Sequence, residues 1–137
     1  MHSYAEKIAA IGAAANPTFL TLGITPLSWG NDKAVLKMTV DPGKLNGAGF
    51  LQGGFYVILA DEAIALAILA GLEAGQNTTT ISETTEFIKS VKEGEIFASA
   101  KIIRKGRRII FAEAEVRAGS PDGQLLSRTT TSYLITA

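Results

Sequence analysis

Apolar residues dominate one stretch of this chain, from Phe55 to Leu72, and only two charges interrupt it. The stretch contains good helix formers, no proline and no run of β-branched residues, which predicts one helix of about five turns. A helix that is apolar on every side is expected to be buried on every side. It is not expected to cross a membrane, because Asp61 and Glu62 lie in its middle and the flanking apolar segments are too short.

These two charges are adjacent carboxylates. Neighbouring residues on a helix point about 100° apart, so Asp61 and Glu62 cannot share one environment. Burying a carboxylate costs free energy unless a partner compensates it, so the carboxylate held inside is a functional candidate. The alternative is a structural role, in which a hydroxyl or an arginine pairs with it.

Shorter patterned segments flank the helix. Residues 3–15 carry apolar side chains at helical spacing and predict a short helix that ends at Asn16-Pro17. A single α+β domain over residues 1–137 is therefore expected, with an antiparallel sheet of about six strands wrapped around one long helix. One face or edge of such a sheet stays open, so an oligomer is expected. The expected strands cover residues 18–29, 33–41, 77–90, 95–105, 107–118 and 124–136, with a hairpin turn at residues 30–32.

Composition narrows the class of protein. Apolar residues make up 47% and charged residues 19% of the chain, as in a globular domain. The formal net charge is zero, so neither nucleic acid nor a membrane surface is an expected partner. The chain has no cysteine, which excludes disulfides, thiolate metal sites and a cysteine nucleophile. The N-terminus lacks the pattern of a signal peptide, so a cytoplasmic location is expected.

The single histidine, His2, lies at a terminus that is expected to be mobile. A Ser-His-Asp triad and a histidine-based metal site both need an imidazole inside the fold, so neither is expected. The chain also lacks a P-loop and a G-x-S-x-G motif. A hydrolase built on this chain would use carboxylates, hydroxyls, amides and the backbone, without a metal or a cofactor.

The loop before the long helix carries a motif with family-like spacing. Asn46, Gln52-Gly53-Gly54 and Asp61 resemble the Asn, His-Gly-Gly and Asp or Glu of hotdog-fold acyl-CoA thioesterases in the PaaI-like, 4-hydroxybenzoyl-CoA thioesterase group. The resemblance implies the hotdog fold, hydrolysis of an acyl-CoA thioester, and a homodimer or a tetramer of two dimers. It covers residues 19–134 and includes hydroxyl-rich segments at 77–85 and 129–132 and a Gly-Arg turn at 106–107.

Physical chemistry suggests roles for this motif. A helix N-terminus presents free N–H groups and the positive end of the helix dipole, so the Gly53 amide would donate to the thioester oxygen. Asp61 would act as nucleophile, through a mixed anhydride, or as general base toward water. Asp61 lies eight residues beyond Gly53, which is about 12 Å along a helix. One copy cannot readily bring both groups to one carbonyl, so a site shared between two subunits is expected.

Other motif residues have two interpretations each. Gln52 stands where the family usually has histidine; it can hydrogen-bond but cannot carry a proton, so it would orient the substrate or position the loop. Asn46 would hold the thioester or the attacking water, or only shape a turn. Thr80 would bind the Asp61 carboxylate or the water, or only favour a strand. Glu62 is expected to be structural or solvent-facing, and it is otherwise the alternative to Asp61 as the functional carboxylate.

The sequence also indicates where acyl-CoA would bind. A basic cluster at one hairpin turn would hold the CoA phosphates, or only keep sheet edges apart. The cluster comprises Lys101, Arg104, Lys105, Arg107 and Arg108. An apolar acyl pocket is expected beside Gly54, lined by residues such as Phe50, Leu51, Phe55, Tyr56 and Phe87.

Three functions fit these features. The first is a cofactor-free acyl-CoA thioesterase. The second is a non-catalytic acyl-CoA or ligand-binding hotdog module, in which Gln52 marks lost chemistry. The third is a dehydratase or isomerase on the same fold, disfavoured because the catalytic histidine is missing. The carboxylate Asp61, kept inside a buried helix, favours the first.

Overall fold

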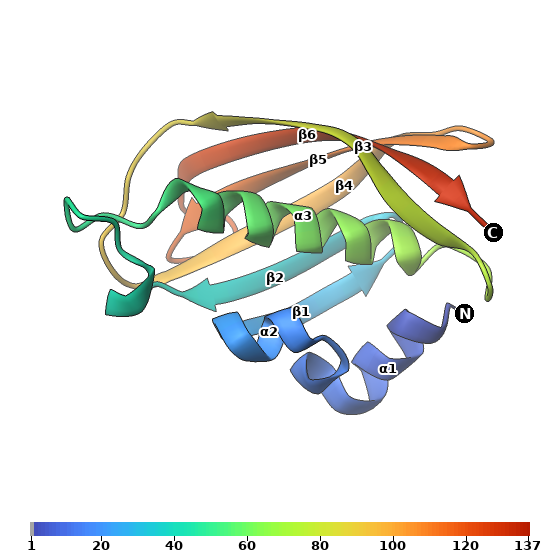
Figure 1. Ribbon diagram of the computed structural model, residues 1–137, viewed down its shortest axis with the longest axis horizontal. Helices are drawn as coiled ribbons and strands as arrows, with labels where there is room; N and C mark the ends of the chain where they lie inside the picture. The colour runs from blue at the N-terminus through green and yellow to red at the C-terminus, as the bar shows by residue number, and fades with distance from the viewer. Residues whose placement is uncertain (1) are drawn as a thin grey trace.

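A computed structural model describes residues 2–137 as one antiparallel sheet curled around a long helix (Figure 1). The helix, α3, spans Gly53–Leu69 and confirms the long helix expected from the sequence. Six strands pair in the order β1-β2-β4-β5-β6-β3, so β1 and β3 form the two edges. The predicted α+β architecture is confirmed. No helix within residues 2–137 is both long and apolar enough to span a membrane.

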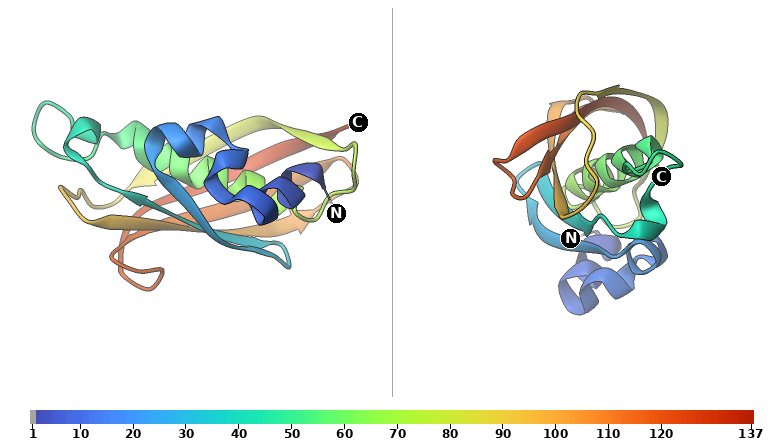
Figure 2. Two further views of the ribbon diagram at one scale, coloured as in Figure 1. Left: turned by 90° about the horizontal axis from the view of Figure 1, so that it is seen from below. Right: turned by 90° about the vertical axis from the view of Figure 1, so that its left-hand side faces the viewer.

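All neighbouring strands are antiparallel, and Figure 2 shows the sheet curving around α3. The hairpin expected at residues 30–32 is present. Asn31 and Asp32 have φ angles of 54° and 62°, as a two-residue type I′ turn requires. The strands are β1 (Ile24–Gly30), β2 (Lys33–Thr39), β3 (Asn77–Phe87), β4 (Glu95–Lys105), β5 (Ile109–Ala118) and β6 (Gln124–Thr136).

The N-terminal segment forms α1 (Ser3–Ile11), the short 3-10 helix η1 (Gly12–Ala15) and α2 (Pro17–Leu22). The prediction of a strand beginning at residue 18 was wrong over its first part. Asn16 caps α2 by accepting from the Thr18 N–H at 2.9 Å, and Pro17 occupies the first helical position, where its fixed φ is favourable. These local helix-start signals prevail over the β-rich composition of the segment, and β1 starts only after Gly23.

His2 is ordered and only 5% exposed, so the expectation of a mobile terminus was wrong. Its Nδ1 accepts from the Tyr4 N–H at 3.1 Å and so caps α1, and its Nε2 lies 2.6 Å from the Gln76 carbonyl oxygen. Both ring nitrogens are therefore engaged with the backbone. The imidazole fastens α1 to the loop before β3, which is a structural role.

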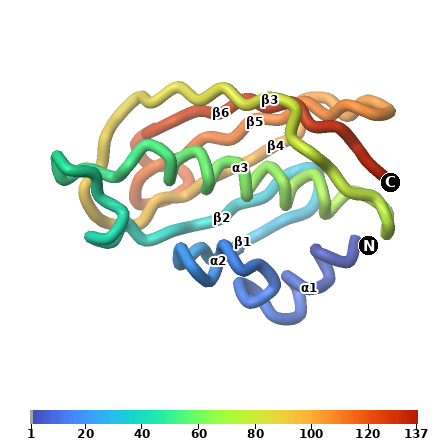
Figure 3. The backbone as a smooth tube through the Cα atoms, in the orientation of Figure 1, coloured from blue at the N-terminus to red at the C-terminus, as the bar shows by residue number. Residues whose placement is uncertain are grey.

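The core lies between α3 and the concave face of the sheet, and the tube in Figure 3 traces this arrangement. Leu59, Ile64 and Ile68 of α3 are fully buried there. One stripe of α3 stays uncovered, however, because Gly54 and Ile58 are exposed and Asp61 and Ala65 are half-buried. The expectation of burial on every side was thus wrong for a single chain, and this stripe runs along the helix at intervals of three and four residues.

Candidate functional site

The loop before α3 is fixed by its own hydrogen bonds. Asn46 Oδ1 accepts from the N–H groups of Ala48 and Phe50, at 2.9 and 3.1 Å. The Gln52 N–H donates to the Lys44 carbonyl at 3.0 Å, and Leu51 donates to the Val91 carbonyl at 2.8 Å. Asn46 therefore shapes a turn, as one of its two predicted interpretations required, and the loop delivers Gln52 to the start of the helix.

No side chain caps the N-terminus of α3. Gln52 is the N-cap residue, yet its exposed side chain makes no capping hydrogen bond. The first N–H groups of a helix have no intrahelical acceptor, and the helix dipole adds positive potential there. A side chain on Gly53 would put a Cβ 3.3 Å from the Phe87 ring, so glycine leaves room for another group. This end of the helix suits an anionic or carbonyl oxygen.

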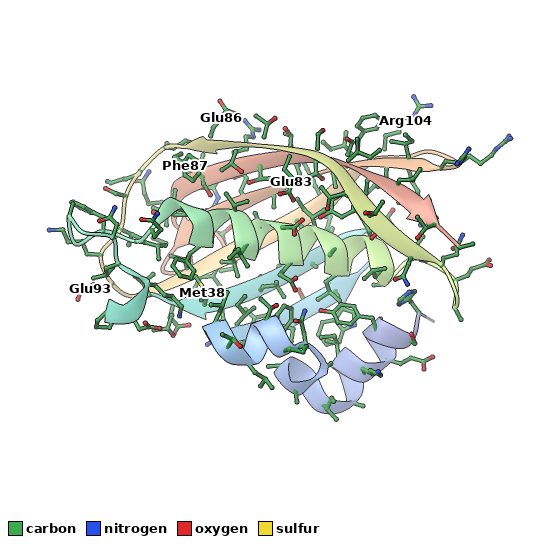
Figure 4. All side chains as sticks on the ribbon, viewed as in Figure 1. Met38, Glu83, Glu86, Phe87, Glu93 and Arg104 are labelled. Atoms are coloured by element: carbon green, nitrogen blue, oxygen red, sulfur yellow. The ribbon has the colours of Figure 1, made fainter. Side chains whose placement is uncertain are left out.

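A cavity of about 380 Å³ lies beside this helix end. Tyr56 and Phe87 meet edge to face there, with ring centroids 6.0 Å apart, and Lys92 Nζ lies 4.8 Å above the Phe50 ring. Figure 4 shows Phe87 at the end of β3 nearest the start of α3. The cavity is lined by Asn46, Phe50, Leu51, Gly53, Tyr56, Phe87, Lys89 and Ser90, which include four of the five side chains expected for an acyl pocket.

Asp61 lies two turns further along α3 and does not line this cavity. The Tyr133 hydroxyl donates to Asp61 Oδ1. Thr80 stands opposite Tyr133 in the β3–β6 ladder. Glu83 lies on the side of β3 that faces α3, with its Oε1 atom buried, and it is near enough to Asp61 for the two carboxyls to influence each other's protonation. Asp61 is thus held against two strands of the sheet.

Tyr133 and Glu83, which lie near Asp61, keep their protons to higher pH than these side chains usually do. Burial, then the hydrogen bond and charge of Asp61, raise the pKa of Tyr133 far above its ordinary value, while the Thr80 hydroxyl opposes this shift. Burial and the same two effects of Asp61 raise the pKa of Glu83 to about 8. At neutral pH, Tyr133 is therefore a donor and Glu83 is largely a neutral acid beside a carboxylate.

Glu62 faces the N-terminal helices instead. Its Oε2 accepts from Asn16 Nδ2 at 2.6 Å, and the same amide group donates to the Tyr4 hydroxyl at 2.9 Å. Burial raises the pKa of Glu62, and the Asn16 hydrogen bond counters that shift. The predicted structural role of Glu62 is supported by these contacts, which fasten α3 to the segment that starts α2.

The basic cluster lies at the other end of α3. Lys105 Nζ is 3.3 Å from the carbonyl oxygen of Gly71, just after the helix ends. Figure 4 shows Arg104 at the opposite end of the molecule from Phe87. Gly106 is required in this turn, since a Cβ there would lie 2.7 Å from the Ile109 carbonyl oxygen. Within one chain, the structure does not bring the basic cluster and Gly53 together.

Sequence reasoning missed Tyr133 and Glu83. Both belong to strands that were predicted, but their contacts with Asp61 depend on strand register and on a bulge between Thr80 and Ser82. One signal was available: Glu83 is an acidic residue within a hydroxyl-rich strand that shares a sheet with an apolar helix. Such a residue needs a partner if it points inward.

A six-stranded antiparallel sheet curled around a central helix defines the hotdog fold, and this chain has that fold. The family model described as the thioesterase superfamily matches residues 48–123, which include Gly53, Asp61 and Glu83. The match covers more than half of the sequence. This chain belongs to the thioesterase superfamily.

Two curated relatives agree with this membership. A Haemophilus influenzae protein named as a proposed esterase is 28% identical over 120 residues, which cover 88% of this chain and 87% of that protein. A Mycobacterium tuberculosis protein named in the same way is 27% identical over 90 residues. This second match covers 64% of each chain, less than two thirds of the mycobacterial relative's length.

Solved structures share the fold. A Haemophilus influenzae thioesterase is 26% identical with a TM-score of 0.80, over 88% of this chain and 83% of that one. A Ralstonia eutropha protein, described as a proposed thioesterase related to phenylacetic acid degradation, is 22% identical with a TM-score of 0.84. That alignment covers 96% of this chain and 99% of the Ralstonia chain, and it concerns the fold alone.

Proposed function

We propose that this protein hydrolyses an acyl-CoA thioester to the free acid and CoA. The observation that carries the proposal is the pairing, on one helix, of an uncapped N-terminus beside an apolar cavity and an inward carboxylate at the family spacing. The Gly53 N–H would stabilise the developing oxyanion, and Asp61 would attack the carbonyl carbon or take a proton from water. Gln52, exposed at the N-cap of α3, would orient the thioester.

The site would be shared between two subunits. Asp61 lies eight residues beyond Gly53 on the same helix, a rise of about 12 Å. The uncovered stripe of α3 includes Asp61, and β3 offers an unpaired edge of 11 residues beside it. A second copy seated on this stripe and edge would cover both, and it would bring its Gly53 toward Asp61 of the first copy.

The same arrangement gives the basic cluster a use. In a two-fold dimer that pairs β3 with β3, the two α3 helices run antiparallel, so the basic turn of one subunit approaches the Gly53 end of the other. Arg104, Arg107 and Arg108 are exposed and would then hold the CoA phosphates. Pairing of dimers into a tetramer and a cytoplasmic location stay predictions.

The test is release of free thiol from a panel of aromatic and straight-chain acyl-CoAs. The chain has no cysteine, so a thiol reagent reads only the product. Turnover with at least one acyl-CoA is expected. Thermal protection by the same compounds, measured in parallel, detects binding separately. Protection without turnover would instead support the ligand-binding module, and absence of both would contradict either function.

Gly53 offers a matched pair of variants for the oxyanion role. Gly53→Pro removes the N–H, while proline at the first helical position is otherwise favourable and the extended Gln52 backbone (φ −62°, ψ 133°) suits a residue before proline. Loss of one such donor should lower kcat by about 10²–10³-fold. Gly53→Ala meets the same Phe87 ring but keeps the N–H, so it should retain most activity. Equal losses in both variants would argue against the amide.

A further inference from the structure

A second carboxyl, partly buried, lies beside Asp61 and lacks the structural partner that Glu62 has. Glu83 lies on the inner face of β3, opposite Thr131 of β6. Its Oε1 atom is buried and accepts no hydrogen bond from any group within residues 2–137. A carboxylate left this way is costly, whereas a neutral acid needs only an acceptor for its proton. Figure 4 shows Glu83 on the side of β3 that faces α3, and Glu86 on the other side.

The groups that face Glu83 come from two neighbouring elements. From α3 comes Asp61, which is the acceptor that a neutral Glu83 needs. From β6 comes Tyr133, which donates to the same Asp61 carboxylate. Glu62 faces Asn16 instead, and no cation within the described chain contributes to the shift of Glu83. The surroundings thus favour one negative charge on the Asp61–Glu83 pair rather than two.

We infer that Glu83 is a positioning residue for Asp61: it retains its proton at neutral pH and uses it to donate a hydrogen bond to the Asp61 carboxylate. Asp61 then accepts from two donors, Glu83 and Tyr133, which together fix its orientation toward the substrate. No bond of the substrate is made or broken by Glu83. The inference rests on the proposed catalytic role of Asp61 and adds the group that holds it.

A pH dependence follows from this arrangement. The pKa of Glu83 is raised to about 8, so its proton is present at pH 7 and lost above pH 8. Its loss places two negative charges in contact, and their repulsion would turn Asp61 away from its productive position. Tyr133 does not produce this loss, because its pKa is raised far above its ordinary value. We expect kcat at pH 9 to be about a tenth of its value at pH 7.

Variants at residue 83 separate positioning from simple packing. The amide of Glu83→Gln donates to Asp61 at every pH, so the alkaline decline should disappear. Glu83→Ala has no donor and should have a kcat at pH 7 about tenfold below that of Glu83→Gln. KM should change little in both, because Glu83 does not touch the substrate. Glu86→Gln, on the outer face of the same strand, is the control and should keep the wild-type profile.

Carboxyl carbon NMR tests the pair without any turnover. Wild type should have one glutamate that titrates near pH 8, absent in Glu83→Gln and shifted to lower pH in Asp61→Asn. Titration of Glu83 in the ordinary glutamate range, or an alkaline decline that persists in Glu83→Gln, would overturn the inference. A wild type that has this titration but no thioesterase activity would support the pair and contradict the proposed reaction instead.

Discussion

Asp61 and Glu62 are neighbours on α3, yet they meet different parts of the molecule. Glu62 turns toward the N-terminal helices, where the Asn16 amide binds it at 2.6 Å. Asp61 turns toward β6 and β3, where it meets a phenol and a second carboxyl. The first environment is a fixed dipole that satisfies a partly buried acid. The second is a set of titratable groups along an uncovered stripe.

This difference separates a structural carboxylate from a candidate catalytic one. The pKa of Glu62 is raised, so an altered pKa alone would single out the wrong residue. What distinguishes Asp61 is the surroundings: partners that hold protons, and a helix face that the chain itself leaves open. Burial identifies both carboxylates as unusual, and only their partners tell them apart.

Replacing Asp61 should reduce activity more than any other single change, and replacing Glu62 should not. Asp61→Asn is nearly isosteric and should reduce kcat by about 10²–10⁴-fold, because an amide can neither attack the carbonyl nor accept a proton from water. Glu62→Gln, one residue away, keeps an oxygen that accepts from Asn16 and should stay within a few-fold of wild type. Thiol release from the best acyl-CoA measures both. Similar losses of kcat in the two variants would contradict a specific catalytic role for Asp61.

A matched pair of tyrosines should have a smaller effect. Tyr133→Phe removes the hydroxyl that donates to Asp61, and hydrogen bonds to charged groups are worth about 1.5–3 kcal/mol, so kcat should fall by tenfold or more. Tyr4→Phe removes only an acceptor of the Asn16 amide on the Glu62 side, and its kcat should be unchanged. Steady-state kinetics at pH 7 give the comparison. A full-rate Tyr133→Phe would show that Asp61 needs no orientation from β6.

The smallest effect on activity is expected at Asn16. Asn16→Ala removes the donor to Glu62 and the cap of α2, and it should destabilise the fold by about 1–3 kcal/mol. The loss should grow as pH rises, because the Asn16 hydrogen bond lowers the pKa of Glu62, and without it the partly buried carboxylate ionises at a greater cost to stability. Thermal unfolding at pH 5 and pH 8 checks this. Activity per folded molecule should not change.

The pattern of apolar and polar residues predicted most elements of the fold. The apolar run predicted α3 to within a few residues, and the strand-like segments between turn signals predicted β2, β4, β5 and β6 nearly at their observed bounds. The error at residues 18–22 arose because Asn16-Pro17 was interpreted as the end of one helix, although the same pair starts the next. An Asn-Pro pair can either end one helix or start the next, so the local sequence alone does not decide between the two.

The candidate site was only half predictable. Gly53 and Asp61 lie on one helix, so spacing within a short segment was enough to find them. Tyr133 and Glu83 reach Asp61 through the register of β6 and β3, with a bulge at residue 81 that a sequence pattern does not reveal. Contacts between side chains of separate strands could therefore be identified only from the three-dimensional structure of the sheet.

Mixed dimers test whether Gly53 of one subunit and Asp61 of the other form one site, as we propose. Asp61→Asn and Gly53→Pro subunits would be co-expressed with different tags, and the mixed dimer purified by both. Each parent variant is expected to be nearly inactive. The mixed dimer should regain one intact site of two, about half of the wild-type rate, because its two sites are related by a two-fold axis. A mixed dimer no more active than its parents would contradict the shared site.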